Sequence, residues 1–384
     1  MMTGSLSKEA AVPFQLPEMF SPQVDKNSLN GGRLTSESSW DTNALFRLSD
    51  EIIAGRRLTA EEVRAILQAP DTAILEILAA AYRVRRHFHG MKMRLNMLIN
   101  AKSGLCGEDC AYCSQSKIST ASIAKYPLLD EDVILAGAAA AVERKASTYC
   151  IAIAGRSPNP REMERLCQTI SRIKERFPLK VCLSPGLLTL AQAEALKKAG
   201  LDRVNHNLNT GRRFYREICS THTYEDRLAT LKAARQAGLE LCCGGIIGMG
   251  EGEDDLIDFI LALGELRPES VPINFLIPIA GTPLEGRPAP SPIHCLKVLS
   301  LIRFATPTSD LRIAAGREVH LGPLQPLGLF VANSIFVGDY LTTKGQPPEE
   351  DYRMIAALGF EIEQVIHGES AAVCEDTSPA PVAQ

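Results

Sequence analysis

Residues 147–185 read STYCIAIAGRSPNPREMERLCQTISRIKERFPLKVCLSP and contain two apolar runs separated by an amphipathic segment. The runs STYCIAIAG and LKVCLSP are nearly continuous in apolar residues, which is typical of strands covered on both faces. The intervening REMERLCQTISRIKERF has apolar residues at helical spacing. A strand, a helix and a strand in this order predict two parallel strands joined by a crossover helix.

The same alternation extends in both directions along the chain. Eight apolar runs are predicted as strands, at residues 95–101, 147–155, 179–185, 202–209, 239–248, 271–278, 311–316 and 333–339. Amphipathic helices are predicted between most of them, at residues 130–145, 161–177, 190–200, 224–238 and 254–266. Eight such units over roughly 250 residues indicate an α/β fold of the closed (β/α)8 TIM-barrel type. A doubly wound open sheet is the alternative.

Two helices are expected before the barrel. The segment LTAEEVRAIL, residues 58–67, begins with a capping box formed by Thr59 and Glu62. A second helix is expected at residues 71–88, where Asp71 is the predicted N-cap.

The two ends of the chain lack this periodicity. Residues 1–42 are rich in Ser, Pro, Gly, Asn and charged residues, and residues 368–384 end in EDTSPAPVAQ. Segments of this kind bury too little apolar surface to fold, so we expect a disordered N-terminal arm and a disordered C-terminal tail. Residues 43–367 are predicted to form one barrel domain that includes the N-terminal helices.

The composition of the 384 residues excludes several classes of protein. A net charge of -4 gives no basic field for binding nucleic acid, and no run of about 18 or more apolar residues could span a membrane. The N-terminus resembles neither a secretory signal nor an Arg-rich transit peptide. We therefore expect a cytoplasmic protein without nucleic-acid or membrane partners. In such a chain, eleven dispersed cysteines favour metal binding or catalysis over disulfide scaffolding.

The segment SGLCGEDCAYCSQS, residues 103–116, contains Cys106, Cys110 and Cys113. A structural zinc site needs four ligands, and no second Cys or His pair lies at a suitable distance. Buried core thiols do not suit so polar a segment, which follows the first predicted strand. An iron–sulfur cluster fits better, because three ligands leave one iron of a 4Fe–4S cluster open to a substrate or cofactor. Loops after the strands also form the active sites of such barrels.

The C-x3-C-x2-C spacing, with an aromatic residue before the last cysteine, resembles the signature of radical S-adenosylmethionine enzymes. The resemblance implies a 4Fe–4S cluster on Cys106, Cys110 and Cys113 whose open iron binds the amino and carboxylate groups of S-adenosylmethionine. One electron from the cluster then releases a 5′-deoxyadenosyl radical. Tyr112 matches the aromatic residue that lies beside the adenine.

A second motif strengthens this resemblance. The segment GGIIGMGE, residues 244–251, matches the G-x-I-x-G-x-x-E pattern of the superfamily on the fifth predicted strand. The matching residues are Gly244, Ile246, Gly248 and Glu251. The same small residues also suit a tight turn from a strand to a helix, and both interpretations can hold together.

Over residues 90–360 the chain resembles one family in particular, biotin synthase. The matching blocks include GLCGEDCAYCSQS, TYCIAIAGR, GLDRVNHNLNT, LCCGGIIGMGE, PESVPINFLIPIAGTPL and ANSIFVGDYLTT. The resemblance implies a sulfurtransferase that converts dethiobiotin to biotin and uses two S-adenosylmethionine molecules per product. One departure is Gly107, where the family usually has Pro, which removes a φ constraint from the loop.

The resemblance also implies a second, 2Fe–2S cluster inside the barrel, which supplies the sulfur. The matching ligands are Cys150, Cys182, Cys242 and Arg312, which lie on four different predicted strands. Inward side chains from different strands of a barrel meet in layers, so these residues can come together. The alternative for each cysteine taken singly is a small buried core residue.

Substrate and cofactor contacts follow from the same resemblance. Asn207, Asn209 and Asn274 match residues that hydrogen-bond the ureido ring of the substrate and neighbouring groups, and Arg227 matches an arginine that pairs with the carboxylate of S-adenosylmethionine. The alternatives are a buried polar network for the asparagines and a solvated helix charge for Arg227.

The family resemblance further implies a homodimer and a reduced electron donor of the flavodoxin or ferredoxin type. Two other functions remain open from the sequence. One is a radical enzyme of a related type, such as a hydrogenase-maturation or methylornithine-type enzyme, and the other is a non-catalytic iron–sulfur electron carrier.

Overall fold

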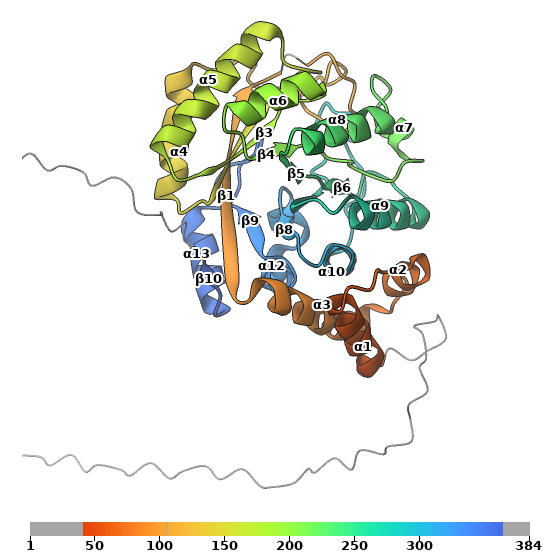
Figure 1. Ribbon diagram of the computed structural model, residues 1–384. Helices are drawn as coiled ribbons and strands as arrows, with labels where there is room; N and C mark the ends of the chain where they lie inside the picture. The colour runs from red at the N-terminus through yellow and green to blue at the C-terminus, as the bar shows by residue number, and fades with distance from the viewer. Residues whose placement is uncertain (1–40, 105, 364–384) are drawn as a thin grey trace, which may run out of the picture. The chain divides into compact units, whose positions relative to one another are not determined.

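The computed structural model describes residues 41–104 and 106–363. Within them, a parallel sheet closes on itself because β9 pairs with β1 as well as with β8 (Figure 1). The strands are β1 (Lys92–Lys102), β2 (Thr148–Ile153), β3 (Lys180–Ser184), β4 (Arg203–Asn205), β5 (Glu240–Cys242), β6 (Gly245–Ile247), β7 (Ser270–Phe275), β8 (Asp310–Ile313), β9 (Ser334–Phe336) and β10 (Glu361–Ile362). The predicted (β/α)8 barrel is therefore confirmed, and the open sheet is excluded.

The fifth predicted strand is divided in two. β5 pairs with β4 and β7, whereas β6 pairs with β7 alone among the named strands of the described residues. Gly244 lies between the halves, where a Cβ atom would stand 1.8 Å from the carbonyl oxygen of Pro272 on β7. This close approach of two backbones interrupts the ladder. The short strand β10, which pairs with β1, was not predicted.

The predicted crossover helices are present and surround the barrel (Figure 1). They are α4 (Glu131–Glu143), α5 (Pro160–Arg176), α6 (Leu190–Lys198), α8 (Tyr224–Gln236) and α9 (Glu253–Leu266). A sixth crossover helix, α10 (Pro292–Ala305), was not predicted. Shorter elements fill the other connections: α7 (Tyr215–Ile218), α11 (Arg317–His320), η2 (Gly322–Leu324), α12 (Gln325–Leu329) and α13 (Pro348–Ala357).

The N-terminal helices pack against one another and against α9 and α10 (Figure 1). They are α1 (Thr42–Ile53), α2 (Ala60–Leu67), the short η1 (Asp71–Ala73) and α3 (Ile74–His89). Helix α1 was not predicted, although it buries Leu45, Leu48 and Ile52. The capping box of Thr59 and Glu62 is confirmed.

The predicted N-cap at Asp71 is wrong. Pro70 precedes η1, and the Asp71 carboxylate accepts a hydrogen bond from Lys297 Nζ on α10 at 2.9 Å. The predicted arm, apart from residues 41 and 42, and the predicted tail lie outside the described residues. Among the helices of the described part, none alone is long and apolar enough to cross a membrane; one pair, Ala60–Leu67 and Asp71–His89, passes on length and composition but is bent by 108°.

The close contact at Gly244 predicts a strong effect of a single methyl group. We expect Gly244→Ala to lower the free energy of unfolding by about 1–3 kcal/mol or more, because the new Cβ meets backbone that cannot move aside easily. Gly107→Ala is the matched control, since a Cβ there meets nothing within 4 Å. Anaerobic chemical unfolding followed by circular dichroism measures both. Equal stabilities of the two variants would contradict this account of the divided strand.

Candidate functional site

A cavity of about 400 Å³ lies at the carboxyl ends of the barrel strands. Its wall brings together most of the residues that the sequence singled out: Cys106, Cys110, Tyr112, Cys113, Cys150, Cys182, Asn207, Asn209, Arg227, Cys242, Ile246, Asn274 and Arg312. Apart from Arg227 on α8, these residues come from β2, β3, β5, β6, β7 and β8 or from the loops after β1 and β4. Closure of the barrel therefore places two separate sets of three cysteines in one space.

The loop that carries the first three cysteines is held by the segment after α7. Ala111 N–H donates to the Ile218 carbonyl at 2.8 Å. The Asp109 carboxylate accepts from the backbone N–H groups of Ser220 and Thr221 at 2.9 and 3.1 Å, and from both hydroxyls of these residues. The loop conformation is thus fixed by backbone contacts in a different part of the chain.

Glu108 adds a second attachment on the same side. Its carboxylate accepts a hydrogen bond from Thr221 Oγ1 at 2.6 Å, contacts His222 Nδ1, and pairs with Arg156 at 3.3 Å. The neighbouring acids of the CGEDC segment therefore both anchor the loop, and although Glu108 also lines the cavity, its carboxylate is engaged by Thr221, His222 and Arg156.

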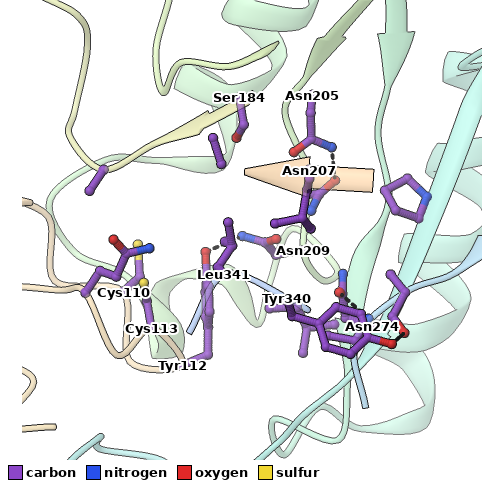
Figure 2. Close-up of a pocket in the computed structure, with 18 of the residues that line it drawn as sticks. Cys110, Tyr112, Cys113, Ser184, Asn205, Asn207, Asn209, Asn274, Tyr340 and Leu341 are labelled. Atoms are coloured by element: carbon purple, nitrogen blue, oxygen red, sulfur yellow. Dashed lines mark hydrogen bonds between the residues drawn. The ribbon is translucent and has the colours of Figure 1, made fainter. Parts of the chain in front are cut away.

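The outer cysteines, Cys106, Cys110 and Cys113, fit an iron–sulfur cluster. All three line the cavity, none is in a disulfide, and Cys113 interacts electrostatically with both Cys106 and Cys110. Figure 2 shows the Cys110 and Cys113 side chains beside Tyr112. Three thiols from one loop, whose two carboxylates are already bound by other protein groups, suit a cluster better than a zinc ion or a hard cation.

Arg227 is buried, so the alternative of a solvated helix charge is wrong. Its Nη1 donates to the Asn207 carbonyl and its Nη2 to His222 Nε2, both at 2.9 Å, and its Nε donates to the Tyr215 hydroxyl. The residue lines the cavity, and its predicted contact with a carboxylate remains a prediction.

The inner cysteines, Cys150, Cys182 and Cys242, lie together in the cavity wall on β2, β3 and β5. Interaction with Cys182 lowers the pKa of the Cys150 and Cys242 thiols, although burial opposes the shift. The pKa of Cys182 itself is raised well above its usual value. Three neighbouring cysteines, two of them with a lowered pKa, suit a metal cluster because thiolates are the form that binds metal.

Arg312 stands beside these cysteines with neutral partners. Its Nη2 donates to Asn96 Oδ1 at 2.7 Å and to Ser270 Oγ at 3.2 Å, and its Nε donates to Ser334 Oγ at 3.4 Å. Its guanidinium lies 4.7 Å from the Phe336 ring. Among the described residues it has no carboxylate within ion-pair distance, so its charge is available to the nearby thiols.

The asparagines form a column on one wall of the cavity (Figure 2). Asn205 Nδ2 lies 3.3 Å from Cys242 Sγ and 3.2 Å from Asn207 Oδ1, which also accepts from Gly244 N–H. Asn209 Nδ2 donates to the Tyr112 hydroxyl at 2.7 Å. Asn205 was not predicted as a site residue, although it continues the two-residue spacing of Asn207 and Asn209.

Asn274 supports the barrel as well as lining the cavity. Its Nδ2 donates to the Gly245 carbonyl at 3.2 Å, and its Oδ1 accepts from Ala315 N–H at 3.1 Å. One amide hydrogen remains for a ligand. The alternative of a structural polar network is thus partly correct for this residue.

The G-x-I-x-G-x-x-E motif acts here mainly as a turn. Of its members only Ile246 lines the cavity. Gly248 has a φ of 98° and donates its N–H to Glu251 Oε1 at 2.6 Å, which closes the turn before α9. Burial raises the pKa of Glu251. Any effect of Gly244, Gly248 and Glu251 on a cofactor is therefore indirect, through the shape of this turn.

Two family profiles match the chain. The Radical SAM superfamily matches residues 102–263, and the Biotin and Thiamin Synthesis associated domain matches residues 272–361. Together they cover the barrel from the end of β1 to β10.

Several curated relatives are named biotin synthase. The relative from Bacillus cytotoxicus is 50% identical over 318 residues, which cover 83% of this chain and 96% of the relative. The relative from Bacillus subtilis strain 168 is 49% identical over 323 residues, covering 84% and 96%. The relative from Rhodopirellula baltica is 50% identical over 315 residues, covering 82% and 88%.

Solved structures with the same fold are more distant in sequence. A methylornithine synthase has a TM-score of 0.72 at 21% identity, covering 83% of this chain and 98% of that one. The FeFe-hydrogenase maturase HydG from Carboxydothermus hydrogenoformans has a TM-score of 0.71 at 17% identity, covering 83% and 79%. At these identities the likeness shows the fold alone.

The hydrogen bonds from Ser220 and Thr221 to the Asp109 carboxylate hold the loop that carries Cys106, Cys110 and Cys113. We call these bonds the clamp, and it can be tested at Asp109. We expect Asp109→Asn to speed amide exchange at Ser220 and Thr221 at least about fivefold at pH 7, because charge-assisted hydrogen bonds are lost, at a cost of about 1 kcal/mol. Asp258→Asn is the control, since that carboxylate accepts from Arg212 N–H elsewhere. Hydrogen exchange with mass spectrometry gives the rates.

The pH dependence of this clamp has a definite sign. Burial alone would raise the pKa of Asp109, but hydrogen bonds from Ser220 and Thr221 lower it below its ordinary value. The stabilisation is therefore complete above the ordinary pKa of Asp and is lost as the pH falls toward the lower folded value. Parent and variant should converge in acid. Equal exchange rates at pH 7 would show that the clamp does not order this segment.

Proposed function

The chain belongs to the biotin synthase family, and from this premise we propose how its residues divide the work of inserting sulfur into dethiobiotin. The observation that carries the proposal is the presence of two cysteine sets, of different origin, in one cavity. One set lies in the loop after β1, and the other lies on β2, β3 and β5. Two sets in one space suit a reaction that needs a radical source and a sulfur source close to one substrate.

The outer set, Cys106, Cys110 and Cys113, is proposed to hold a 4Fe–4S cluster, and the inner set, Cys150, Cys182 and Cys242 with Arg312, a 2Fe–2S cluster. When bound, the outer cluster with S-adenosylmethionine supplies the radical that removes hydrogen from two unactivated carbons in turn, and the inner cluster supplies the sulfur. Each biotin formed uses two S-adenosylmethionine molecules. The chain itself contributes ligands, orientation and a cavity sheltered from water.

Arg312 is proposed to complete the inner site. Its neutral partners leave the guanidinium charge uncompensated next to three thiols. A cation in this position favours thiolates and therefore favours metal binding. Its hydrogen bonds to Asn96 and Ser270 fix where that charge lies.

The asparagine column is proposed to bind the substrate. Asn207 uses its Oδ1 to hold Gly244 and Asn205, so its two amide hydrogens remain free for the ureido carbonyl of dethiobiotin. Asn209 and Tyr112 are joined by a hydrogen bond, which orients the ring proposed to lie beside the adenine. Asn274 offers one further amide hydrogen, and Arg227 a charge for the carboxylate of S-adenosylmethionine.

The remaining partners follow from the family. We propose that a reduced protein of the flavodoxin or ferredoxin type donates the electrons, that the chain forms a homodimer, and that it works in the cytoplasm without nucleic-acid or membrane partners.

The division of labour between the two cysteine sets is tested by Cys182→Ala. We expect this variant to keep a 4Fe–4S cluster and to cleave some S-adenosylmethionine, yet to form no biotin, because Cys182 interacts with both other inner cysteines and its loss removes one of three proposed thiolate ligands. Cys243→Ala is a matched control, since that buried cysteine adjoins Cys242 but lies outside the cavity wall. Anaerobic reconstitution with iron, sulfide, reductant and both substrates, followed by spectroscopy and mass spectrometry, gives the result. Biotin formation by Cys182→Ala at the parent rate would place the sulfur source elsewhere.

Substrate recognition is tested by Asn207→Asp. This change keeps the acceptor for Gly244 N–H and removes the two amide donors, so the fold is retained while the contact with the ureido carbonyl is lost. We expect dethiobiotin to bind about 5- to 150-fold more weakly, equivalent to about 1–3 kcal/mol. Asn159→Asp at the N-cap of α5 is the control, because Asp caps a helix as well as Asn. Unchanged affinity in an anaerobic binding titration would return Asn207 to a structural role.

A further inference from the structure

A fourth cysteine lies against the outer set. Cys219 follows α7, is 5% exposed, and places its Sγ 3.9 Å from Cys110 Sγ. Its position is set by the same clamp that holds the loop, because Asp109 binds Ser220 and Thr221 directly after it and Ala111 binds Ile218 directly before it. The two sulfur atoms are therefore neighbours for reasons independent of any bound group.

Cys110, Cys219 and His222 come close enough together to suggest a separate metal site. The contacts of His222 argue against that interpretation. Arg227 Nη2 donates to His222 Nε2, so Nδ1 carries the proton and donates it to Glu108. Neither ring nitrogen keeps a free lone pair for a metal.

The hydrogen-bond partners of Cys219 favour a different role. Cys219 Sγ donates to Asp109 Oδ1 at 3.3 Å, and this oxygen also accepts from the N–H groups of Ser220 and Thr221 and from Thr221 Oγ1. Its lone pairs are therefore largely occupied. In the described structure Cys110 Sγ donates to Cys219 Sγ. A Cys110 that binds iron is a thiolate with no proton to donate. Its sulfur can then only accept, and Cys219 is its one hydrogen-bonding neighbour among the described residues.

We propose that Cys219 is a positioning residue that donates its S–H to the sulfur of Cys110 when Cys110 binds the outer cluster, and so raises the reduction potential of that cluster. The inference rests on the proposed function, which assigns Cys110 to the cluster. Hydrogen bonds to ligand sulfurs withdraw electron density and stabilise the reduced state. The outer cluster must accept an electron before S-adenosylmethionine is cleaved, so this contact favours the first step.

The potential of the outer cluster measures this contact directly. We expect Cys219→Ala to lower it by about 30–60 mV, which corresponds to a three- to tenfold shift in a one-electron equilibrium. Cys219→Ser retains a donor and should restore most of the difference. Cys295→Ala removes a buried thiol from α10, away from the cavity, and should leave the potential unchanged. Anaerobic redox titration followed by electron paramagnetic resonance, with iron and sulfide analysis, gives the values.

The possible results separate this inference from the function on which it rests. A parent protein without a 4Fe–4S signal would overturn both. A normal parent signal whose potential is the same in Cys219→Ala would overturn this inference alone. If Cys219→Ser loses the cluster although circular dichroism shows a folded chain, or if Cys110→Ala keeps a cluster that the added Cys219→Ala change removes, then Cys219 acts as a metal ligand and the proposal is wrong.

Discussion

Pairing between β9 and β1 is the contact on which the site depends. Arg94, Leu95 and Asn96 of β1 are in register with Ser334, Ile335 and Phe336 of β9, and this ladder turns a curved sheet into a closed barrel. Closure removes the free sheet edges and gives the inward side chains a single shared interior. Cys150 and Cys182 then lie in register on neighbouring strands, and Arg312 reaches partners on β1, β7 and β9. Of these contacts, the hydrogen bond from Arg312 on β8 to Asn96 on β1 depends directly on closure of the sheet.

Much of the architecture could be predicted because it depends on local patterns. Buried parallel strands are apolar along their whole length and helices show a 3.6-residue period, so both can be recognised directly from the sequence pattern. The break between β5 and β6 at Gly244 has no such sequence pattern, because its cause is the carbonyl of Pro272, nearly thirty residues away. Asp71 failed as an N-cap because Lys297 of α10, also distant in sequence, binds its carboxylate. Helix α1 could have been found from the spacing of Leu45, Leu48 and Ile52.

The residues of the site divide in the same way, into those that a local sequence pattern identifies and those that depend on contacts distant in sequence. Cysteine spacing and family resemblance identified the residues that now line one cavity, and two-residue spacing placed Asn207 and Asn209 together. The same spacing also included Asn205, whose contact with Cys242 links the asparagine column to the inner cysteines. No motif or spacing in the sequence marked Cys219 or His222 as a residue of the site. Their importance comes from the clamp between two loops about 110 residues apart, which only the folded chain reveals.

The clamp also bears on how the outer cluster is acquired and replaced. Asp109 and Glu108 fix the loop through contacts to protein groups alone, so the conformational entropy of ordering it is lost when the chain folds, before any cluster is bound. A receptor prepared in this way binds its ligand more tightly than one that must fold around it. A cluster that is inserted after folding would therefore meet a loop that is already ordered. If oxidation removed the iron, the loop would keep its conformation. Repair would then require delivery of a cluster without refolding of the enzyme.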